Sequence, residues 1–205
     1  ERNRAALGRS ARGRRKLLVT PLRVNGIAGI ALSFERLTVS HSGGRMQIEV
    51  QRKDASAAGG DAVVIPLTRS DAPPRALGAL DDAIGGWLAR VWSAGDFSGK
   101  TGEVISFPVA GIAAKRVVLI GLGDEKNASA ESLRAAAGRA AKALARAKAK
   151  QASLVVPALR RVKPEEAAQA LAEGALLGAY RFDKYKSDDD RPAALEKLAL
   201  LAPDA

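Results

Sequence analysis

The chain has 205 residues, which is enough for one domain of ordinary size with extensions but not for a second enzyme-sized domain. Hydrophobic residues make up 47% of it and aromatic residues only 4%, so the core must consist mainly of Ala, Val, Leu and Ile. Cysteine is absent and His41 is the only histidine, which excludes disulfides, thiolate metal sites, His-rich zinc sites and a Ser-His-Asp triad in the folded body.

The formal charge of +11 is concentrated in residues 1–45, where basic side chains far outnumber the two acidic ones. A signal peptide is disfavoured there, because Arg23 interrupts the apolar stretch and no small-residue cleavage site follows. An organellar presequence fits the composition better. The third interpretation is upstream sequence read in frame, with Met46 as the true start, because strand-like alternation begins directly after it. We expect a basic, disordered leader, and its longest apolar stretch, residues 27–32, is too short to span a membrane.

The next segment predicts two strands and a helix. Residues 47–51 alternate polar and apolar, which predicts a half-buried edge strand, and residues 62–67 predict a more buried one. After a loop at residues 69–75, apolar side chains recur with the helical period of 3.6 residues. They predict a single helix with Trp87 on its core face, together with Leu77, Leu80, Ile84, Leu88 and Val91.

Two adjacent apolar runs follow, at residues 103–109 and 117–123, and the short turn between them predicts a hairpin and therefore a mixed sheet. The second run shows no alternation, so we expect it to be the central strand, buried on both faces. It ends with Gly121 and Gly123. These glycines allow a sharp turn or a close approach to a ligand, another strand or a helix end.

The remaining sequence predicts two helices and two strands. Ser129 is a suitable N-cap for an Ala-rich helix over residues 129–150, and Pro164 begins a helix that extends to residue 187 and carries small residues for close packing. Strands are expected at residues 152–157 and 195–201, with a charged loop at residues 188–192. The pattern indicates an α/β fold with a mixed sheet flanked by helices. The buried face of the first helix is expected to hold Leu133, Ala136, Ala137, Ala140, Leu144 and Ala147.

Two glycine motifs have part of the pattern of a phosphate-binding loop. Gly121-Leu122-Gly123 follows a strand, but a third glycine is missing and Asp124 and Glu125 would repel a pyrophosphate. The run Gly99-Lys100-Thr101 lacks the first loop glycine and the preceding strand of a Walker motif. A tight turn is therefore the favoured interpretation.

No catalytic, metal-binding or cofactor-binding residue emerges from the sequence, because it contains no convincing nucleophile–base pair or acid/base dyad. The acidic run at residues 188–190 lacks the spaced oxygen ligands of a calcium loop and is interpreted as a solvated linker. One row of basic residues has two interpretations: a solvated helix face, or a non-specific contact with the phosphates of a nucleic acid. The row consists of Arg139, Lys142, Arg146 and Lys150.

Four stretches carry a more specific pattern: residues 94–103, with a Gly-Asp-Phe-x-Gly-Lys-x-Gly-Glu core, 117–123, 129–150 and 172–187. The last is the most specific, since the run from Glu173 to Leu177 leads into Tyr-Arg-Phe-Asp-Lys-Tyr-Lys-Ser. In order and spacing these stretches resemble the N-terminal domain of the leucyl aminopeptidase family, the M17 cytosol aminopeptidases. The resemblance covers the chain from Met46 onward.

The resemblance implies a macro-domain-like three-layer fold. It also implies a cytoplasmic parent enzyme, a hexamer whose separate C-terminal domain holds two divalent metals, Zn, Mn or Mg, and removes N-terminal residues from peptides. The family's Asn-Thr-Asp-Ala-Glu-Gly-Arg metal motif has no counterpart here, so no catalytic or metal residue is carried over.

From this resemblance we expect a leader at residues 1–45 and the N-terminal domain at residues 46–187. Residues 188–205 are then a loop and final strand leading to an absent catalytic domain. The chain alone is expected to be non-catalytic and to serve packing and assembly. The alternatives are a nucleic-acid-binding module and, by analogy of fold alone, a pocket for ADP-ribose.

Overall fold

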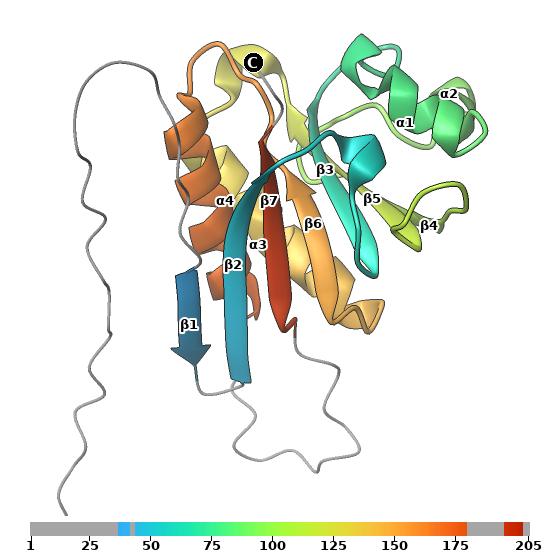
Figure 1. Ribbon diagram of the computed structural model, residues 1–205. Helices are drawn as coiled ribbons and strands as arrows, with labels where there is room; N and C mark the ends of the chain where they lie inside the picture. Colours follow the sequence, from blue (N-terminus) through green and yellow to red (C-terminus); the bar gives the residue numbers. More distant parts are fainter. Residues whose placement is uncertain (1–36, 42–43, 180–194, 203–205) are drawn as a thin grey trace, which may run out of the picture. The chain divides into compact units, whose positions relative to one another are not determined.

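The computed structural model describes residues 37–41, 44–179 and 195–202. In these residues seven strands form one sheet in the order β1-β2-β7-β6-β3-β5-β4 (Figure 1). The strands are β1 Leu37–His41, β2 Gly44–Arg52, β3 Ala62–Thr68, β4 Val104–Pro108, β5 Arg116–Gly123, β6 Gln151–Val155 and β7 Lys197–Ala202. The helices are α1 Gly78–Ala83, α2 Trp87–Ser93, α3 Ala130–Arg146 and α4 Pro164–Ala179, with short 3-10 turns at Ala55–Ala57, Arg75–Leu77 and Glu125–Asn127.

The sheet is mixed, as the sequence predicted. Its five inner strands run parallel, and the two edge strands, β1 and β4, pair antiparallel with their neighbours. The predicted hairpin is present, with Phe107 of β4 opposite Val117 of β5. Inner parallel strands are normally buried on both faces, and β5 follows this rule, since only Arg116 at its start is partly exposed.

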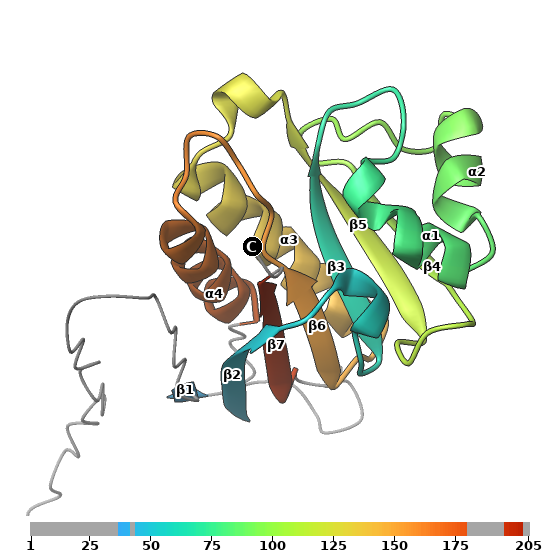
Figure 2. The same cartoon turned by 45° about the horizontal axis from the view of Figure 1, so that its top comes forward.

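Helices cover the two faces of the sheet, which confirms the three-layer α/β architecture (Figure 2). The pair α3 and α4 packs on one face, where Leu133 and Leu171 meet Val64 and Leu198 in the larger core. Helices α1 and α2 pack on the other face at the β3–β5–β4 end, where a second core forms around Leu88. In the described part of the chain, no helix covers the β6–β7–β2 half of that second face (Figure 2).

Close packing of α3 against α4 confirms the role predicted for the small residues. The backbone of α3 approaches so closely that the Arg134 carbonyl oxygen occupies the position of a Cβ at Gly174, and Gly178 faces the Gly138 Cα in the same way. Small residues at such a crossing let two helix backbones come together. Arg134 also bridges the two helices, since its Nε lies 2.9 Å from Glu173.

The single helix predicted over residues 77–91 is in fact two short helices. Gly85 and Gly86 adopt positive φ angles of 74° and 76° and separate α1 from α2. The break changes the orientation of the second helix, so the prediction that Trp87 lies in the core is wrong: Trp87 is 43% exposed and Trp92 is buried instead. The other predicted core positions of this segment are buried, namely Leu77, Leu80, Ile84, Leu88 and Val91.

Helix α3 begins at the predicted N-cap. The Ser129 hydroxyl accepts a hydrogen bond from the Ser132 amide at 3.3 Å, and the Ser132 hydroxyl accepts one from the Ser129 amide at 2.9 Å, which together form a capping box. Five of the six positions predicted for its buried face are buried. The prediction for Ala147 is wrong, because α3 ends at Arg146 and Ala147 is an exposed C-cap.

Two predictions about strand position are corrected. β5 is not the central strand, because it lies between β3 and the edge strand β4, whereas β6 occupies the middle of the sheet. β2 is half-buried as predicted but is not an edge strand, because β1 pairs with its outer side.

Two strands of the sheet, β1 and β7, lie outside residues 46–187, the range expected for the N-terminal domain. β1 lies before Met46 and pairs with β2 from Leu37 opposite Ile48. At the other end, β7 is an inner strand that pairs with both β2 and β6. The rest of the predicted leader, the end of the second helix at residues 180–187 and the acidic loop at residues 188–192 lie outside the described residues.

No helix in the described ranges is both long and apolar enough to cross a membrane.

Candidate functional site

The Gly-Asp-Phe-x-Gly-Lys-x-Gly-Glu motif forms a loop, residues 95–103, that packs on the end of β5. The Glu103 carboxylate holds the loop closed by accepting hydrogen bonds from the amides of Ser98 and Lys100, both at 3.0 Å. Gly99 adopts a φ of 79°, which glycine tolerates, and a side chain there would meet the backbone of Thr68. The motif is therefore a structural device in which a carboxylate organises a tight loop.

The two glycines that end β5 face this loop. The Lys100 carbonyl oxygen occupies the position that a Cβ at Gly121 would need. The Gly121 amide donates to the Glu103 carbonyl oxygen at 2.8 Å, and the Gly123 amide donates to the Gly99 carbonyl oxygen at 2.9 Å. A close approach of another backbone segment is observed at Gly121, and the predicted sharp turn is observed at Gly123, which adopts a φ of 83°. Residues 99–101 occupy the space directly beside both glycines.

Aromatic packing fixes the start of the same loop. Phe97 is buried against Trp92 with edge-to-face geometry at 5.0 Å between ring centroids. The Trp92 indole N–H donates to the Ser70 carbonyl oxygen at 3.1 Å, so the polar end of this buried ring is satisfied. Residues 95–103 are thus anchored at both ends.

The predicted row of basic side chains is only partly brought together. Arg139, Lys142 and Arg146 lie on α3, with Lys142 and Arg146 exposed and Arg139 half-buried beside the Gly102 turn. Lys150 is not on this helix, because the chain reverses after Arg146 and Lys148 adopts a φ of 54°. The Lys150 Nζ lies 3.6 Å from a Glu196 carboxylate oxygen, which partly neutralises its charge.

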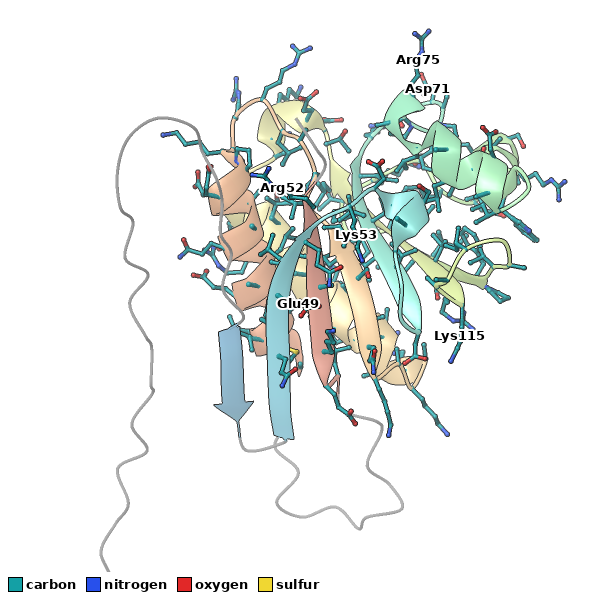
Figure 3. The ribbon with its side chains drawn as sticks, viewed as in Figure 1. Glu49, Arg52, Lys53, Asp71, Arg75 and Lys115 are labelled. Atoms are coloured by element: carbon teal, nitrogen blue, oxygen red, sulfur yellow. The ribbon has the colours of Figure 1, made fainter. Side chains whose placement is uncertain are left out.

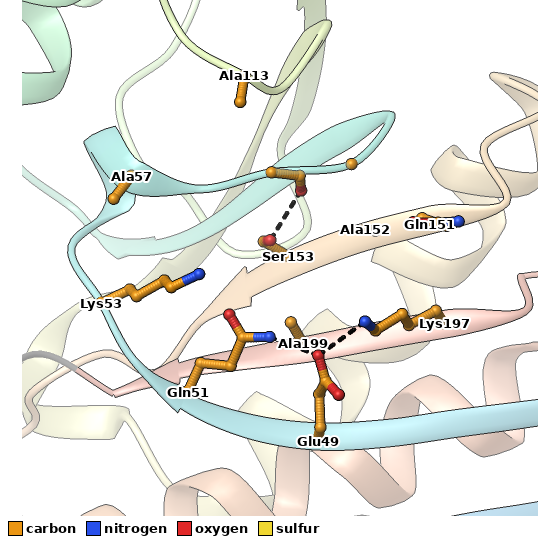
Figure 4. A pocket seen from close by; sticks show the side chains of 12 residues that line it. Glu49, Gln51, Lys53, Ala57, Ala113, Gln151, Ala152, Ser153, Lys197 and Ala199 are labelled. Atoms are coloured by element: carbon orange, nitrogen blue, oxygen red, sulfur yellow. Dashed lines mark hydrogen bonds and ion pairs between the residues drawn. The ribbon is translucent and has the colours of Figure 1, made fainter.

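A polar pocket of about 330 Å³ lies on the second sheet face, over the β6–β7–β2 half that no described helix covers. Its floor comes from β2, β7 and β6, and the segment around Ala57 to Gly60 and the turn at Ala113 form its walls (Figure 4). The polar side chains that line it are Glu49, Gln51, Lys53, Gln151, Ser153 and Lys197. Sequence reasoning missed this pocket.

The charged groups of the pocket are partly paired. Glu49 is 13% exposed, and its carboxylate receives an ion pair from the Lys197 Nζ at 3.0 Å and a hydrogen bond from the Gln51 amide. The Ser153 hydroxyl donates to the Gly59 carbonyl oxygen at 2.9 Å (Figure 4). Lys53 follows β2 and lies on the same side of the sheet as Glu49 (Figure 3).

One end of the pocket is fixed by Asp61. Its carboxylate accepts hydrogen bonds from the amides of Lys150 at 2.9 Å and Gln151 at 3.2 Å, and from the Lys115 Nζ at 3.0 Å. The bond from Lys115 and those from the two amides lower the pKa of Asp61, because they favour its charged form. Asp61 thereby ties the start of β3 to the start of β6.

No group of three or more His, Asp or Glu side chains in the described ranges is placed to hold a metal ion.

The family is decided by a match between residues 40–189 and the N-terminal domain of the cytosol aminopeptidase family. The chain belongs to the cytosol aminopeptidase family. The match confirms the resemblance found in the motifs, and it begins inside β1 rather than at Met46.

Curated members of this family are similar over most of the chain. A probable cytosol aminopeptidase of Protochlamydia amoebophila is 33% identical over 145 residues, covering 69% of this chain and 29% of that protein. One of Roseiflexus castenholzii is 34% identical over 162 residues, covering 77% of this chain and 31% of that protein. The chain thus spans about a third or less of the length of these relatives.

Solved structures support the same fold. A mutant of tomato leucine aminopeptidase matches with a TM-score of 0.65 at 26% identity, over 75% of this chain and 32% of that chain. An Oceanobacillus iheyensis macrodomain solved with ADP matches with a TM-score of 0.61 at 14% identity, over 83% of this chain and 90% of that chain. The second likeness concerns the fold alone, and it confirms the macro-domain-like architecture.

Proposed function

We propose that this chain is the non-catalytic N-terminal domain of a metal-dependent leucyl aminopeptidase, a cytoplasmic enzyme that removes N-terminal residues from peptides. The parent's reaction would take place in a separate C-terminal domain that holds two divalent metals, and the parent would assemble as a hexamer. The role of the present domain is packing and assembly around that catalytic core.

The observation that carries this proposal is what the family motif does in the structure. Phe97, Gly99, Glu103 and Gly121 all make internal contacts that hold the loop of residues 95–103 against β5. Side chains used in this way maintain a shape. They do not present a nucleophile, an acid or a base to a substrate.

Exposed apolar side chains at the β4 edge form a surface that could serve as the contact in assembly. Trp87 is 43% exposed and Val104 is 40% exposed. The Trp87 ring stacks on Phe107 at 5.8 Å, and the Arg90 guanidinium lies 5.9 Å from its centroid. An aromatic ring with an arginine beside it is typical of the residues that contribute most to protein interfaces.

The assembly role is tested in the parent polypeptide. Trp87→Glu should shift the assembled enzyme toward smaller species in analytical ultracentrifugation, whereas Leu177→Glu, at an exposed apolar position on α4, serves as the matched control. An unchanged sedimentation profile for Trp87→Glu would remove the β4 edge from the assembly surface. Sedimentation is measured beside circular dichroism, so that unfolding is recognised.

A second function, binding of nucleic acid, is favoured by the charges of α3. Lys142 and Arg146 are exposed one turn apart, and Arg139 lies one turn before Lys142 on the same side. Such a row would contact phosphates without reading bases. Binding should then weaken steeply with salt and should be lost in the Lys142→Glu, Arg146→Glu double variant, with Lys163→Glu as the control.

Deletion of residues 1–36 separates this function from the basic leader. If affinity for DNA disappears with those residues and the α3 variant binds as the parent chain does, the folded domain is not the binder. Retained affinity that depends on Lys142 and Arg146 supports the second function.

ADP-ribose binding rests on fold analogy alone and ranks third. Calorimetry with ADP-ribose tests it directly, and the absence of heat would eliminate it.

A further inference from the structure

We propose that the polar pocket on the open face of β2, β7 and β6 binds a small anion, a carboxylate or a phosphate ester, with Lys53 as its principal contact. This site is separate from the surface of the proposed assembly role, since its floor lies on β2, β7 and β6, whereas Trp87 and Val104 lie at the β4 end of the sheet. The inference rests on the shape of the pocket, its unbalanced charge and the hydrogen-bonding capacity of its floor.

The amino-acid pattern of the floor departs from that of buried parallel strands. Toward α3 and α4 the same strands present apolar residues, such as Ile48, Leu154 and Leu198. Toward the pocket they present Glu49, Gln51, Gln151, Ser153 and Lys197. A flat solvated sheet would explain polar residues, but here Ser153 is only 3% exposed and the surface is concave. Convergent polar groups at the bottom of a cavity are typical of a small-molecule site.

The charged side chains that line the pocket carry a net positive charge. Lys197 is paired with Glu49 at 3.0 Å, so these two groups compensate each other. Lys53 also lines the pocket and extends its ammonium group into it from the opposite side (Figure 4), so the charged lining residues are one carboxylate, Glu49, and two lysines, Lys53 and Lys197. A net charge of one positive unit in a recessed site favours an anionic ligand.

The hydrogen-bonding groups of the pocket further restrict the class of ligand that it can bind. The Ser153 hydroxyl gives its proton to the Gly59 carbonyl, so toward the pocket its oxygen can only accept. The amide of Gln151, which also lines the pocket, offers two donors and one acceptor. An anion that also carries a hydroxyl or amino group would therefore use both kinds of partner.

The size of the pocket limits the ligand to a small molecule. Its volume of about 330 Å³ is at the lower end of the range of roughly 300–1,000 Å³ for ligand sites. A hydroxy acid, an amino acid or a sugar phosphate suits this volume, whereas a dinucleotide is too large.

The test is an NMR titration of the 205-residue chain with sodium L-lactate and, separately, with sodium glycerol 2-phosphate, each against sodium chloride at the same ionic strength. The proposal expects saturable shifts for the amides of Lys53, Gly59 and Ser153 with at least one of these two anions. The arm that saturates identifies the carboxylate or the phosphate as the preferred group.

Two variants make the result decisive. Lys53→Gln should weaken binding about tenfold or more, the loss expected for one charge-assisted hydrogen bond, while Lys163→Gln on another surface should leave it unchanged. Both positions are exposed, so neither change disturbs the core. Shifts that fail to saturate with both anions, or equal affinities for the two variants, would overturn the proposal.

Discussion

The carbonyl oxygen of Lys100 lies where the side chain of any residue other than glycine at position 121 would begin. This relationship joins two stretches of the family pattern, the loop of residues 95–103 and the end of β5. It explains why a glycine follows the aliphatic run of residues 117–120 within β5.

Gly121→Ala should therefore destabilise the domain by about 3 kcal/mol or more, because the new methyl group displaces the backbone of Lys100. Gly78→Ala is the matched control: Gly78 lies in α1 with helical φ and nothing within 4 Å of a Cβ, so alanine should be neutral or stabilising by about 1 kcal/mol. Urea unfolding measures both. Equal effects of the two substitutions would contradict the packing described for Gly121.

The α3–α4 crossing offers a second pair of glycines. Gly174→Ala should destabilise by about 2 kcal/mol or more, since its methyl group would meet the Arg134 carbonyl and the Ala137 Cβ. Gly138→Ala places a methyl group at an ordinary 3.6 Å from the Gly174 carbonyl oxygen, so the better helix propensity of alanine should dominate. Thermal unfolding that ranks Gly138→Ala below Gly174→Ala in stability would show that the crossing is arranged differently.

The two tryptophans should differ in what they contribute to stability. Trp92→Ala removes a buried ring that contacts Phe97 and donates to Ser70, and it should reduce the free energy of unfolding by about 3–5 kcal/mol. Trp87→Ala removes a half-exposed ring and should reduce it by only about 1 kcal/mol. Chemical denaturation followed by circular dichroism compares them, and a larger loss for Trp87→Ala would restore the single-helix prediction.

Asp61 should make the stability of the domain depend on pH. The pKa of Asp61 is lower in the folded state than its ordinary value of 3.8. Its contribution to the free energy of unfolding is therefore fully present above pH 3.8 and is lost as the pH falls through the folded pKa. Asp61→Asn should therefore lower stability by about 1–2 kcal/mol at neutral pH, and by much less once the pH is below the folded pKa of Asp61, where the carboxyl group itself is protonated.

The control for this prediction is Lys115→Met. It removes the strongest single partner of Asp61 but leaves the two amide hydrogen bonds, and Lys115 is 79% exposed, so the loss should stay below about 1 kcal/mol. A stability difference between the parent chain and Asp61→Asn that stays constant from neutral to acidic pH would contradict the assigned cause.

Much of the fold could be predicted from local sequence. The Ser129 cap, the Pro164 helix start and the hairpin ending at residue 123 depend on residues near each other in the chain, and all three are observed. The prediction that Trp87 lies in the core was wrong because Gly85 and Gly86, both with positive φ, break the helix. The spacing of apolar residues in the sequence continues across this break without a change of period.

Strand order and the polar pocket could not be predicted in the same way. β7 is separated from both of its neighbours in the sequence, and only its pairing with β2 and β6 places Lys197 beside Glu49. The alternation in β2 did show that Glu49 and Gln51 share a face. It contained no information about which residues of other strands would lie on that face with them.

The central claim is that this domain shapes and assembles an aminopeptidase without performing its chemistry. The most direct measurement is hydrolysis of leucine p-nitroanilide by the purified chain in the presence of manganese, with its folded state verified by circular dichroism. We predict a rate equal to that of manganese alone. A rate that increases in proportion to the concentration of the chain and disappears with EDTA would contradict the claim.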